Sequence, residues 1–316
     1  MKKLTAVSLS PAIDKHIEFE HFVMGATNRV LHTRSEGSGK AVNVALSSSV
    51  LGIETSIVGL LGEGGDAVTR RLERAQVSCS FIPVPGLVRT NQKLLDRSTG
   101  ITTEINEPTP EVPRRLLLEM ADLAVESARE SEIMVLTGSL PQKCPSDWYA
   151  RVLRRVHEEA PYCRCVLDAE GEKLSLGVCE HPWLIKPNRF ELELCAGRKL
   201  LDQHDIISAA KKLISQGCEM VAVSLGAEGA VLVTDHAAYS GYVEVEHVET
   251  TVGAGDAMVA GLAYSALFGG DEERMLACGL AAAAARVEAP HAAAHIDGEV
   301  FSEKLQRVQI TEVPVL

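Results

Sequence analysis

Short apolar runs alternate along the chain with segments in which hydrophobic residues recur at helical spacing. The apolar runs predict buried strands at residues 4–8, 55–60, 133–138, 163–168, 183–188, 220–226 and 230–234. The helical spacing predicts helices at residues 42–51, 66–76, 114–130, 147–159, 189–195, 204–216, 256–268, 273–287 and 300–308. Repeated strand–helix units with nearly all-apolar strands predict an α/β fold, with a doubly wound, mainly parallel sheet covered by helices on both faces.

Two stretches, at about residues 15–34 and 87–106, break this rhythm. Polar and apolar residues alternate in them, and turns containing glycine join their halves. Such alternation is typical of half-exposed antiparallel strands, so we expect a small antiparallel β lid that projects from the main sheet. We see no long linker, repeat or low-complexity tract between two halves, which predicts one domain over residues 1–316.

Composition narrows the function classes further. The 316 residues are 46% hydrophobic and 23% charged, which is typical of soluble globular proteins, and the net charge of −12 argues against nucleic-acid binding. The sequence has no apolar run of eighteen residues and no signal-peptide pattern, so we expect no membrane association. Eight scattered cysteines are most simply read as reduced thiols in the cytoplasm.

The segment VETTVGAGDAMVAGL places glycines and a carboxylate where an apolar helix begins. Gly253 and Gly255 weaken helix interiors and therefore belong to a turn with Ala254, while Asp256 lies in the first helical turn. The backbone N–H groups of such a turn lack intrahelical partners and point at one place, with the positive end of the helix dipole behind them. The sequence therefore predicts an anion site beside Asp256.

Polar residues and glycines follow several predicted strands, and in open α/β sheets ligands bind beyond the carboxyl ends of the strands. They are Asp14, Ser139, Asp168, Gly171, Asn188, Glu191, Gly226, Glu228 and Gly229. Singly, each is more often turn chemistry than function, and Asn188 with Glu191 could equally form a helix capping box. Together on one rim they favour a ligand site.

The segment EGSGKAVNVA looks like a phosphate-binding P-loop but does not satisfy that motif. The motif needs glycine at position 34 and serine or threonine after the lysine, whereas this chain has Arg34 and Ala41. Two interpretations stay open. Either the segment is a glycine turn that enters a helix with Lys40 solvated, or Gly37, Gly39, Lys40 and Asn43 contact an anionic, hydroxylated substrate.

The segment TVGAGDAMVAG resembles the C-terminal signature of the ribokinase (PfkB) superfamily of carbohydrate kinases, and GSGKAVNVA resembles its N-terminal signature. The ordered series SPAID, NRV, GSGKAVNVA, RTNQK, TEINEP, TGSLP, VLDAEGE, LIKPNRFELE, VSLGAEGA and TVGAGD resembles the hexose-phosphate branch, over about residues 4–290. That branch contains 1-phosphofructokinase, tagatose-6-phosphate kinase and the minor 6-phosphofructokinase. The resemblance implies a ribokinase-like fold.

The resemblance also implies magnesium-assisted transfer of phosphate from ATP to a sugar-phosphate hydroxyl. Asp256 would be the general base, and the backbone around Gly253, Ala254 and Gly255 would be the anion hole. The sugar phosphate would be bound by Asp14, Gly39, Lys40, Asn43 and Arg89. The nucleotide would be bound by Lys186, Asn188, Glu191, Ser224, Gly226 and Gly229. Glu191 would act on Mg²⁺ through water, and the lid strands would form a homodimer.

The chain departs from the branch pattern at a few positions. Ser38 and Ala41 stand where the family has glycines, so we expect a narrower sugar pocket. Residues 288–299 lack the glycine-rich loop that the family has near the nucleotide base, which leaves adenine selectivity open.

Four functions are compatible with these residues. The first is a 1-phosphofructokinase-like activity, and the second is the same chemistry on tagatose 6-phosphate or another hexose phosphate. The third is a kinase for an unphosphorylated sugar or nucleoside, against which Lys40 and Arg89 argue. The fourth is a non-catalytic sugar-phosphate-binding regulator, against which the intact Gly253, Gly255 and Asp256 argue.

Overall fold

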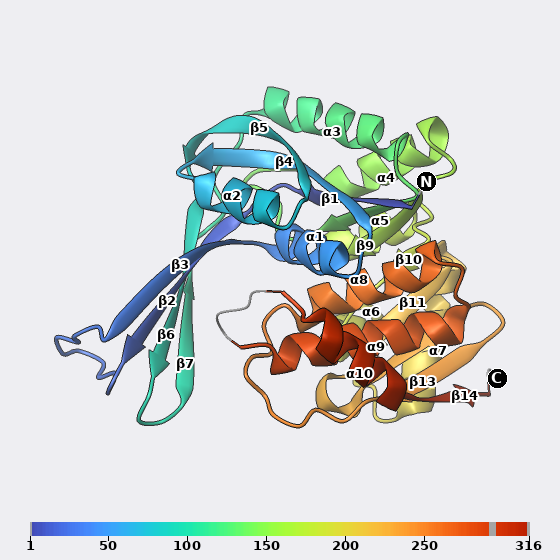
Figure 1. Ribbon diagram of the computed structural model, residues 1–316. Helices are drawn as coiled ribbons and strands as arrows, with labels where there is room; N and C mark the ends of the chain where they lie inside the picture. Colours follow the sequence, from blue (N-terminus) through green and yellow to red (C-terminus); the bar gives the residue numbers. More distant parts are fainter. Residues whose placement is uncertain (1, 291–294, 315–316) are drawn as a thin grey trace.

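A large twisted sheet runs through the molecule in the computed structural model, which describes residues 2–290 and 295–314 (Figure 1). It has ten strands in the order β14-β13-β12-β11-β10-β9-β8-β1-β4-β5. Their bounds are β1 (Lys3–Ser8), β4 (Glu54–Glu63), β5 (Ser78–Leu87), β8 (Ile133–Thr137), β9 (Arg164–Asp168), β10 (Leu184–Ile185), β11 (Met220–Ser224), β12 (Ala230–Val233), β13 (Ala238–Tyr242) and β14 (Gln309–Val313). From β5 to β11 all neighbours are parallel, and β12, β13 and β14 add antiparallel pairs at one edge.

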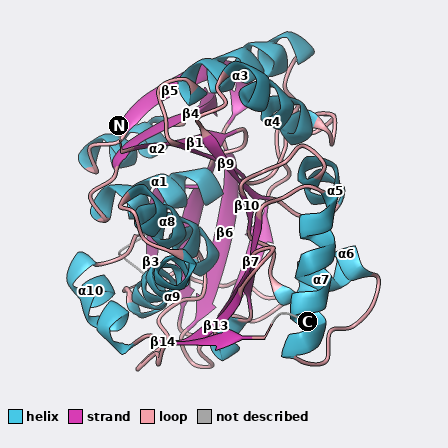
Figure 2. Ribbon diagram, turned by 90° about the vertical axis from the view of Figure 1, so that its right-hand side faces the viewer, coloured by secondary structure: helices cyan, strands magenta, loops and turns pink. Residues whose placement is uncertain are grey.

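Helices cover both faces of this sheet (Figure 2). One side carries α1 (Lys40–Val50), α2 (Asp66–Arg74), α8 (Ala254–Leu267), α9 (Glu272–Glu288) and α10 (Gly298–Arg307). The other side carries α3 (Arg114–Ala128), α4 (Trp148–Glu159), α5 (Glu172–Val178), α6 (Arg189–Ala196) and α7 (Gln203–Gln216). A large apolar core lies on each side of the sheet, because the parallel strands are apolar on both faces. The predicted ribokinase-like α/β fold class is confirmed.

The lid is a four-stranded sheet in the order β3-β2-β6-β7 that projects from the carboxyl edge of the main sheet (Figure 1). Its strands are β2 (Ala12–Phe19), β3 (His32–Ser38), β6 (Arg89–Asp96) and β7 (Ile101–Asn106). The prediction of a purely antiparallel lid is wrong at its centre, where β2 and β6 are parallel. Both strands leave neighbouring parts of the parallel sheet, after β1 and β5, and so they run in the same direction.

Several elements differ from the predicted ones in extent. The strands β5, β13 and β14 and the short helix α5 were not predicted, because their sequences are mixed rather than apolar. The helix predicted at 300–308 begins at Gly298, because the Asp297 side chain caps it by accepting hydrogen bonds from the Glu299 and Val300 N–H groups. Within the described ranges we find no helix with the length and hydrophobicity needed to cross a membrane.

Candidate active site

The first turn of α8 combines a bare helix terminus with a buried carboxylate. Gly253 caps the helix with a φ of 83°, in the left-handed region that glycine adopts without strain. Asp256 is buried in the first turn, and its Oδ2 accepts a 2.8 Å hydrogen bond from Asn43 Nδ2 on α1. A Cβ at position 255 would lie 3.2 Å from Lys186 Nζ, so the lysine ammonium stands directly beside the turn. The predicted anion site is therefore accompanied by a cation.

The environment of Asp256 favours its protonated form. Burial raises the pKa of Asp256 from 3.8 to about 6, and the neighbouring negative charge of Asp168 adds to the effect. The Asn43 hydrogen bond and the charges of Lys40 and Lys186 oppose it. A carboxyl group with a pKa near 6 is ionised at neutral pH and is a better proton acceptor than an ordinary aspartate.

Asp168, at the carboxyl end of β9, joins the two lysines of the site. Its carboxylate is 3.4 Å from Lys186 Nζ and 3.5 Å from Lys40 Nζ, and it accepts a 2.9 Å hydrogen bond from Thr137 Oγ1. Burial would raise the pKa of Asp168, but the charges of Lys186 and Lys40 outweigh it and hold the pKa below 3.8. Burial would lower the pKa of Lys40, and Asp168, Asp256 and Glu191 reverse that effect and raise it. Lys40 therefore stays charged beside the helix terminus.

A second carboxylate, Asp14 on β2, lies at the base of the lid. It forms an ion pair of 2.9 Å with Lys93 and accepts 2.9 Å hydrogen bonds from Ser38 Oγ and Asn91 Nδ2. Burial would raise the pKa of Asp14, but Lys93 and these hydrogen bonds together lower it. Asp14 is thus a fixed anion whose partners come from both neighbouring lid strands.

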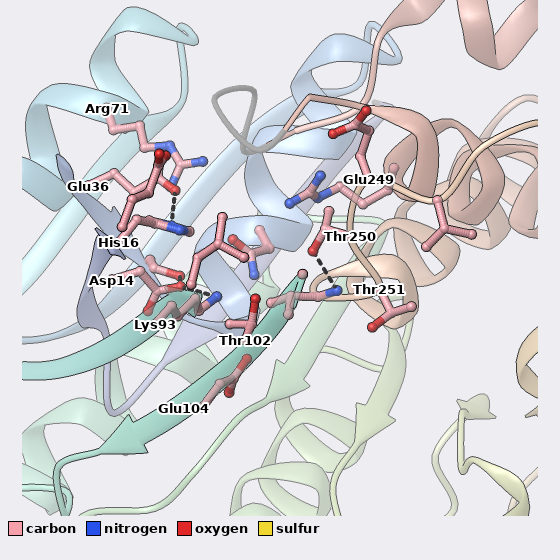
Figure 3. A pocket seen from close by; sticks show the side chains of 18 residues that line it. Asp14, His16, Glu36, Arg71, Lys93, Thr102, Glu104, Glu249, Thr250 and Thr251 are labelled. Atoms are coloured by element: carbon pink, nitrogen blue, oxygen red, sulfur yellow. Dashed lines mark hydrogen bonds and ion pairs between the residues drawn. The ribbon is translucent and has the colours of Figure 1, made fainter. Parts of the chain in front are cut away.

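A cavity of about 440 Å³ separates the lid from the loop at residues 248–252. Figure 3 shows His16, Glu36 and Arg71 on one wall, and Glu249, Thr250 and Thr251 on the other. The lining also includes Asp14, Ser38, Asn43, Lys93, Thr102, Glu104 and Arg286. Because Asn43 lines the cavity and also bonds Asp256, the cavity and the helix terminus form one continuous site.

Three predicted acceptor-binding residues, Gly39, Lys40 and Arg89, lie beside the cavity without lining it. Gly39 caps α1 with a φ of 130° and passes so close to Pro11 that a Cβ would lie 3.2 Å from the Pro11 Cα. The Arg89 guanidinium donates to Asn91 Oδ1 and to the Ser10 carbonyl oxygen, both at 3.4 Å. Arg89 is therefore directed along the base of the lid.

The two departures from the family glycines have different surroundings. Ser38 lines the cavity and donates to Asp14, so its hydroxymethyl group does take up space in the pocket. Ala41 is 2% exposed and packs within an apolar core, so it does not narrow the cavity.

The predicted nucleotide residues gather at the carboxyl ends of β10 and β11. Asn188 and Glu191 form a complete capping box for α6, in which the Glu191 carboxylate accepts a 2.8 Å hydrogen bond from the Asn188 N–H group. A parallel β-bridge connects Asn188 to Ser224. Gly226 and Gly229 have φ values of 64° and 92°, and a Cβ at Gly229 would collide with the Gly241 carbonyl oxygen.

This rim, the N-terminal end of α8 and Lys186 have the chemistry to fit a nucleotide with its phosphates at the helix terminus. Residues 291–294 of the segment at 288–299 lie outside the described residues, so adenine selectivity stays open.

Sequence reasoning missed several charged residues of the site. Alternation along RTNQK places Asn91 and Lys93 on the same face as Arg89, so the lid pattern could have revealed Lys93. For Asp168, the sequence indicates only a position at the end of a strand and no role. Arg71 and Arg286 carried no local signal, because each is one of several charged residues on its helix.

The chain is similar to a family model and to several curated proteins. The family model described as pfkB family carbohydrate kinase matches residues 6–297. The 1-phosphofructokinase of Xanthomonas campestris pv. campestris is 34% identical over 266 residues, covering 83% of each chain. The 1-phosphofructokinase of Escherichia coli K12 is 32% identical over 292 residues, covering 90% of this chain and 91% of its own.

Among solved structures, phosphofructokinase-2 from Escherichia coli in complex with fructose-6-phosphate has the same fold. Its TM-score is 0.89 at 21% identity, over 97% of this chain and 99% of that one. The curated relatives and the matched family model, which covers most of the chain, show the family. The chain therefore belongs to the pfkB family of carbohydrate kinases and is an ATP-dependent sugar kinase.

Proposed function

We propose that the protein is a 1-phosphofructokinase, which converts fructose 1-phosphate and ATP to fructose 1,6-bisphosphate and ADP. The observation that carries the proposal is the buried Asp256 in the first turn of α8, hydrogen-bonded to Asn43, which itself lines the lid cavity. The curated relatives named 1-phosphofructokinase support the choice of acceptor.

Asp256 takes the proton from the attacking sugar hydroxyl, and Asn43 fixes the orientation of its carboxylate. The N–H groups around Gly253, Ala254 and Gly255, together with Lys186, stabilise the negative charge that develops on the phosphoryl oxygens. Bound ATP supplies that phosphoryl group and Mg²⁺ neutralises part of its charge.

On the acceptor side, Asp14 accepts hydrogen bonds from sugar hydroxyls, and Lys93 keeps it ionised. Gly39 allows the backbone to approach the sugar, while Asn43 lies next to the reacting hydroxyl. Lys40 and Arg89 provide positive charge at the edges of the same pocket.

On the nucleotide side, Asn188, Ser224, Gly226 and Gly229 form the rim that contacts ATP. Glu191 holds Mg²⁺ through water, which agrees with the use of one of its oxygens in the α6 capping box. Lys186 approaches the phosphates from beside Gly255.

We also propose that the lid forms a homodimer. Thr102 and Glu104 of β7 line the cavity, so alternation turns Ile101 and Ile105 to the opposite face of the lid. Ile101 is 62% exposed and Ile105 is 50% exposed. Neighbouring exposed apolar side chains of this kind are typical of a surface that another subunit covers.

An assay of ADP release over a panel of acceptors tests the proposed function. We expect the highest kcat/KM with fructose 1-phosphate, and lower values with tagatose 6-phosphate, fructose 6-phosphate and fructose. A higher value with any other acceptor refutes the assignment and names the alternative kinase activity. Measurable binding of sugar phosphate without ADP release would instead identify a non-catalytic regulator.

A further inference from the structure

Two arginines from distant helices, Arg71 on α2 and Arg286 on α9, line the cavity. Arg286 is only 8% exposed, and its Nε is 3.3 Å from the position that a Cβ at Gly253 would take. Arg71 is fixed from the other side, because its Nη1 donates to the Gly37 carbonyl oxygen. The two guanidinium groups thus lie between the base of the lid and the terminus of α8.

Each guanidinium has a buried nitrogen that is not used within the protein. Arg71 Nη2 and Arg286 Nη1 are buried and have no hydrogen-bond partner among residues 2–290 and 295–314. An unsatisfied buried donor is costly, and it is rare in a folded protein unless a ligand or water completes it. Two such donors at one cavity point to a ligand that accepts hydrogen bonds.

Two carboxylates near the arginines, Asp14 and Glu36, are shared with other cations. Asp14 is paired with Lys93, while Glu36 lies 3.2 Å from His16 Nε2 and 3.5 Å from Arg34 Nη2. Burial lowers the pKa of Arg71, the charges of Glu36 and Asp14 oppose this, and the charge of Arg286 adds to it. The two arginines therefore repel each other, and an anion between them would relieve that repulsion.

We propose that Arg71 and Arg286 form a phosphate subsite that binds the phosphate already carried by the sugar acceptor. A guanidinium presents two parallel donors that match phosphate oxygens, and two guanidiniums supply more donors than a sugar hydroxyl or a carboxylate could use. The subsite rests on the proposed function for the identity of the acceptor. It adds helices α2 and α9 to acceptor recognition, beside Arg89 at the base of the lid, whose Nε is likewise buried without a hydrogen-bond partner among the described residues.

Calorimetric titration of the full chain without nucleotide tests this assignment. The probes are fructose 1-phosphate, inorganic phosphate and fructose, and the variants are Arg71→Met and Arg286→Met. Each variant should weaken fructose 1-phosphate binding roughly 10- to 100-fold, as expected for a lost charged hydrogen bond, while ATP affinity stays within about twofold. Arg70→Met on α2 and Arg274→Met on α9 are matched controls on exposed positions and should bind normally.

The substitutions Arg71→Lys and Arg286→Lys keep the charge and are the fallback if a methionine variant fails to fold. They should retain part of the affinity for inorganic phosphate. Unchanged affinity of all four variants for fructose 1-phosphate overturns the subsite, as does a loss of ATP affinity without a loss of sugar-phosphate affinity. Failure of the wild type to bind either phosphate probe also overturns it.

The proposed function can fail independently of the subsite. If the wild type binds fructose 1-phosphate through both arginines but releases no ADP with it, the subsite stands and the kinase assignment fails. If ADP is released normally and the variants bind normally, the kinase assignment stands and the subsite fails.

Discussion

At the scale of a single residue, the burial of Asp256 has two opposing effects, one on its basicity and one on the stability of the fold. The burial that raises its pKa to about 6 makes it an effective base, and the same burial penalises its ionised form in the folded protein. Its hydrogen bond with Asn43 and the nearby lysines offset only part of that penalty.

Replacing Asp256 by asparagine should lower kcat roughly 10²- to 10⁴-fold, because the general base is lost. The affinity for fructose 1-phosphate should change little. In the wild type, kcat/KM should rise as the pH increases through about 6, since only the ionised carboxyl accepts a proton. Steady-state kinetics from pH 5 to 8 measure both effects, and normal turnover of the variant would disprove the assignment.

The same substitution should stabilise the fold above pH 6. An ionised group whose pKa is raised from 3.8 to about 6 costs up to roughly 3 kcal/mol at neutral pH. The folded state binds the proton more tightly than the unfolded state, so this cost develops between about pH 4 and 6 and persists above. In urea unfolding experiments, Asp256→Asn should therefore have a higher free energy of unfolding than the wild type at pH 7.5, and this difference should vanish near pH 4.

Asp168→Asn should have the opposite effect on stability. Asp168 has a lowered pKa, so its ionised form stabilises the folded state at pH values above its unfolded pKa, and this contribution disappears as the pH falls through the folded pKa. Its loss should cost roughly 3 kcal/mol at pH 7.5, since the buried Lys186 and the more exposed Lys40 lose their partner. If Asp256→Asn and Asp168→Asn change the free energy of unfolding in the same direction at pH 7.5, this explanation is wrong.

The sequence predicts some of these residues and not others, for a physical reason. Asp256 is predictable because the glycines that expose the helix terminus are its neighbours in the chain. Lys93 follows from strand alternation once the lid is recognised. Arg71 and Arg286 meet only because α2 and α9 pack on the same side of the sheet, and no local pattern encodes that contact.

At the scale of elements, the start of α8 depends on the backbone conformation of its N-cap residue, Gly253. Gly253 and Gly269, at opposite ends of this helix, have nearly equal φ values of 83° and 81°. A Cβ at Gly253 would approach Arg286 and Asn43, whereas a Cβ at Gly269 would meet no atom within 4 Å among the described residues.

Gly253→Ala and Gly269→Ala should therefore each cost roughly 1–2 kcal/mol of stability, because both place alanine in the left-handed region. Only Gly253→Ala should reduce kcat, because it alone displaces the N–H groups of the anion hole. Unfolding experiments and steady-state kinetics on both variants separate the effects. Equal turnover in the two variants would exclude a role for this turn in transfer.

Ser38→Gly and Ala41→Gly test the two departures from the family pattern. Ser38→Gly widens the cavity and removes a hydrogen bond to Asp14, so it should change the kcat/KM ratio of tagatose 6-phosphate to fructose 1-phosphate roughly tenfold. Ala41→Gly should cost roughly 1 kcal/mol of stability and leave that ratio unchanged, because Ala41 is in the core. A changed ratio in the control would refute this division.

The sequence predicts the strands that are buried on both faces, and it predicts less well the strands whose burial varies along their length. The apolar strands β1, β8, β9 and β11 were recognised because both of their faces are covered. The parallel pairing of β2 with β6 could not be predicted from alternation, which is the same in parallel and antiparallel strands.

At the scale of the whole molecule, the proposed lid dimer can be tested with a pair of surface charges. Ile105→Lys places a charge on the outer face of β7 and should shift the sedimentation coefficient from dimer to monomer. Leu118→Lys, at an equally exposed position on α3, should leave the assembly unchanged. A wild type that sediments as a monomer would refute the dimer. Whether residues 1–316 behave as one cooperative domain stays a prediction.

The cavity takes its walls from Asp14 near the start of the chain and from Arg286 near its end. During synthesis, therefore, the cavity has both of its walls only after the ribosome has completed almost the whole polypeptide. A prematurely terminated chain that stops before α9 lacks Arg286 and the helix that packs on α8, so it should form neither a complete cavity nor a supported helix terminus.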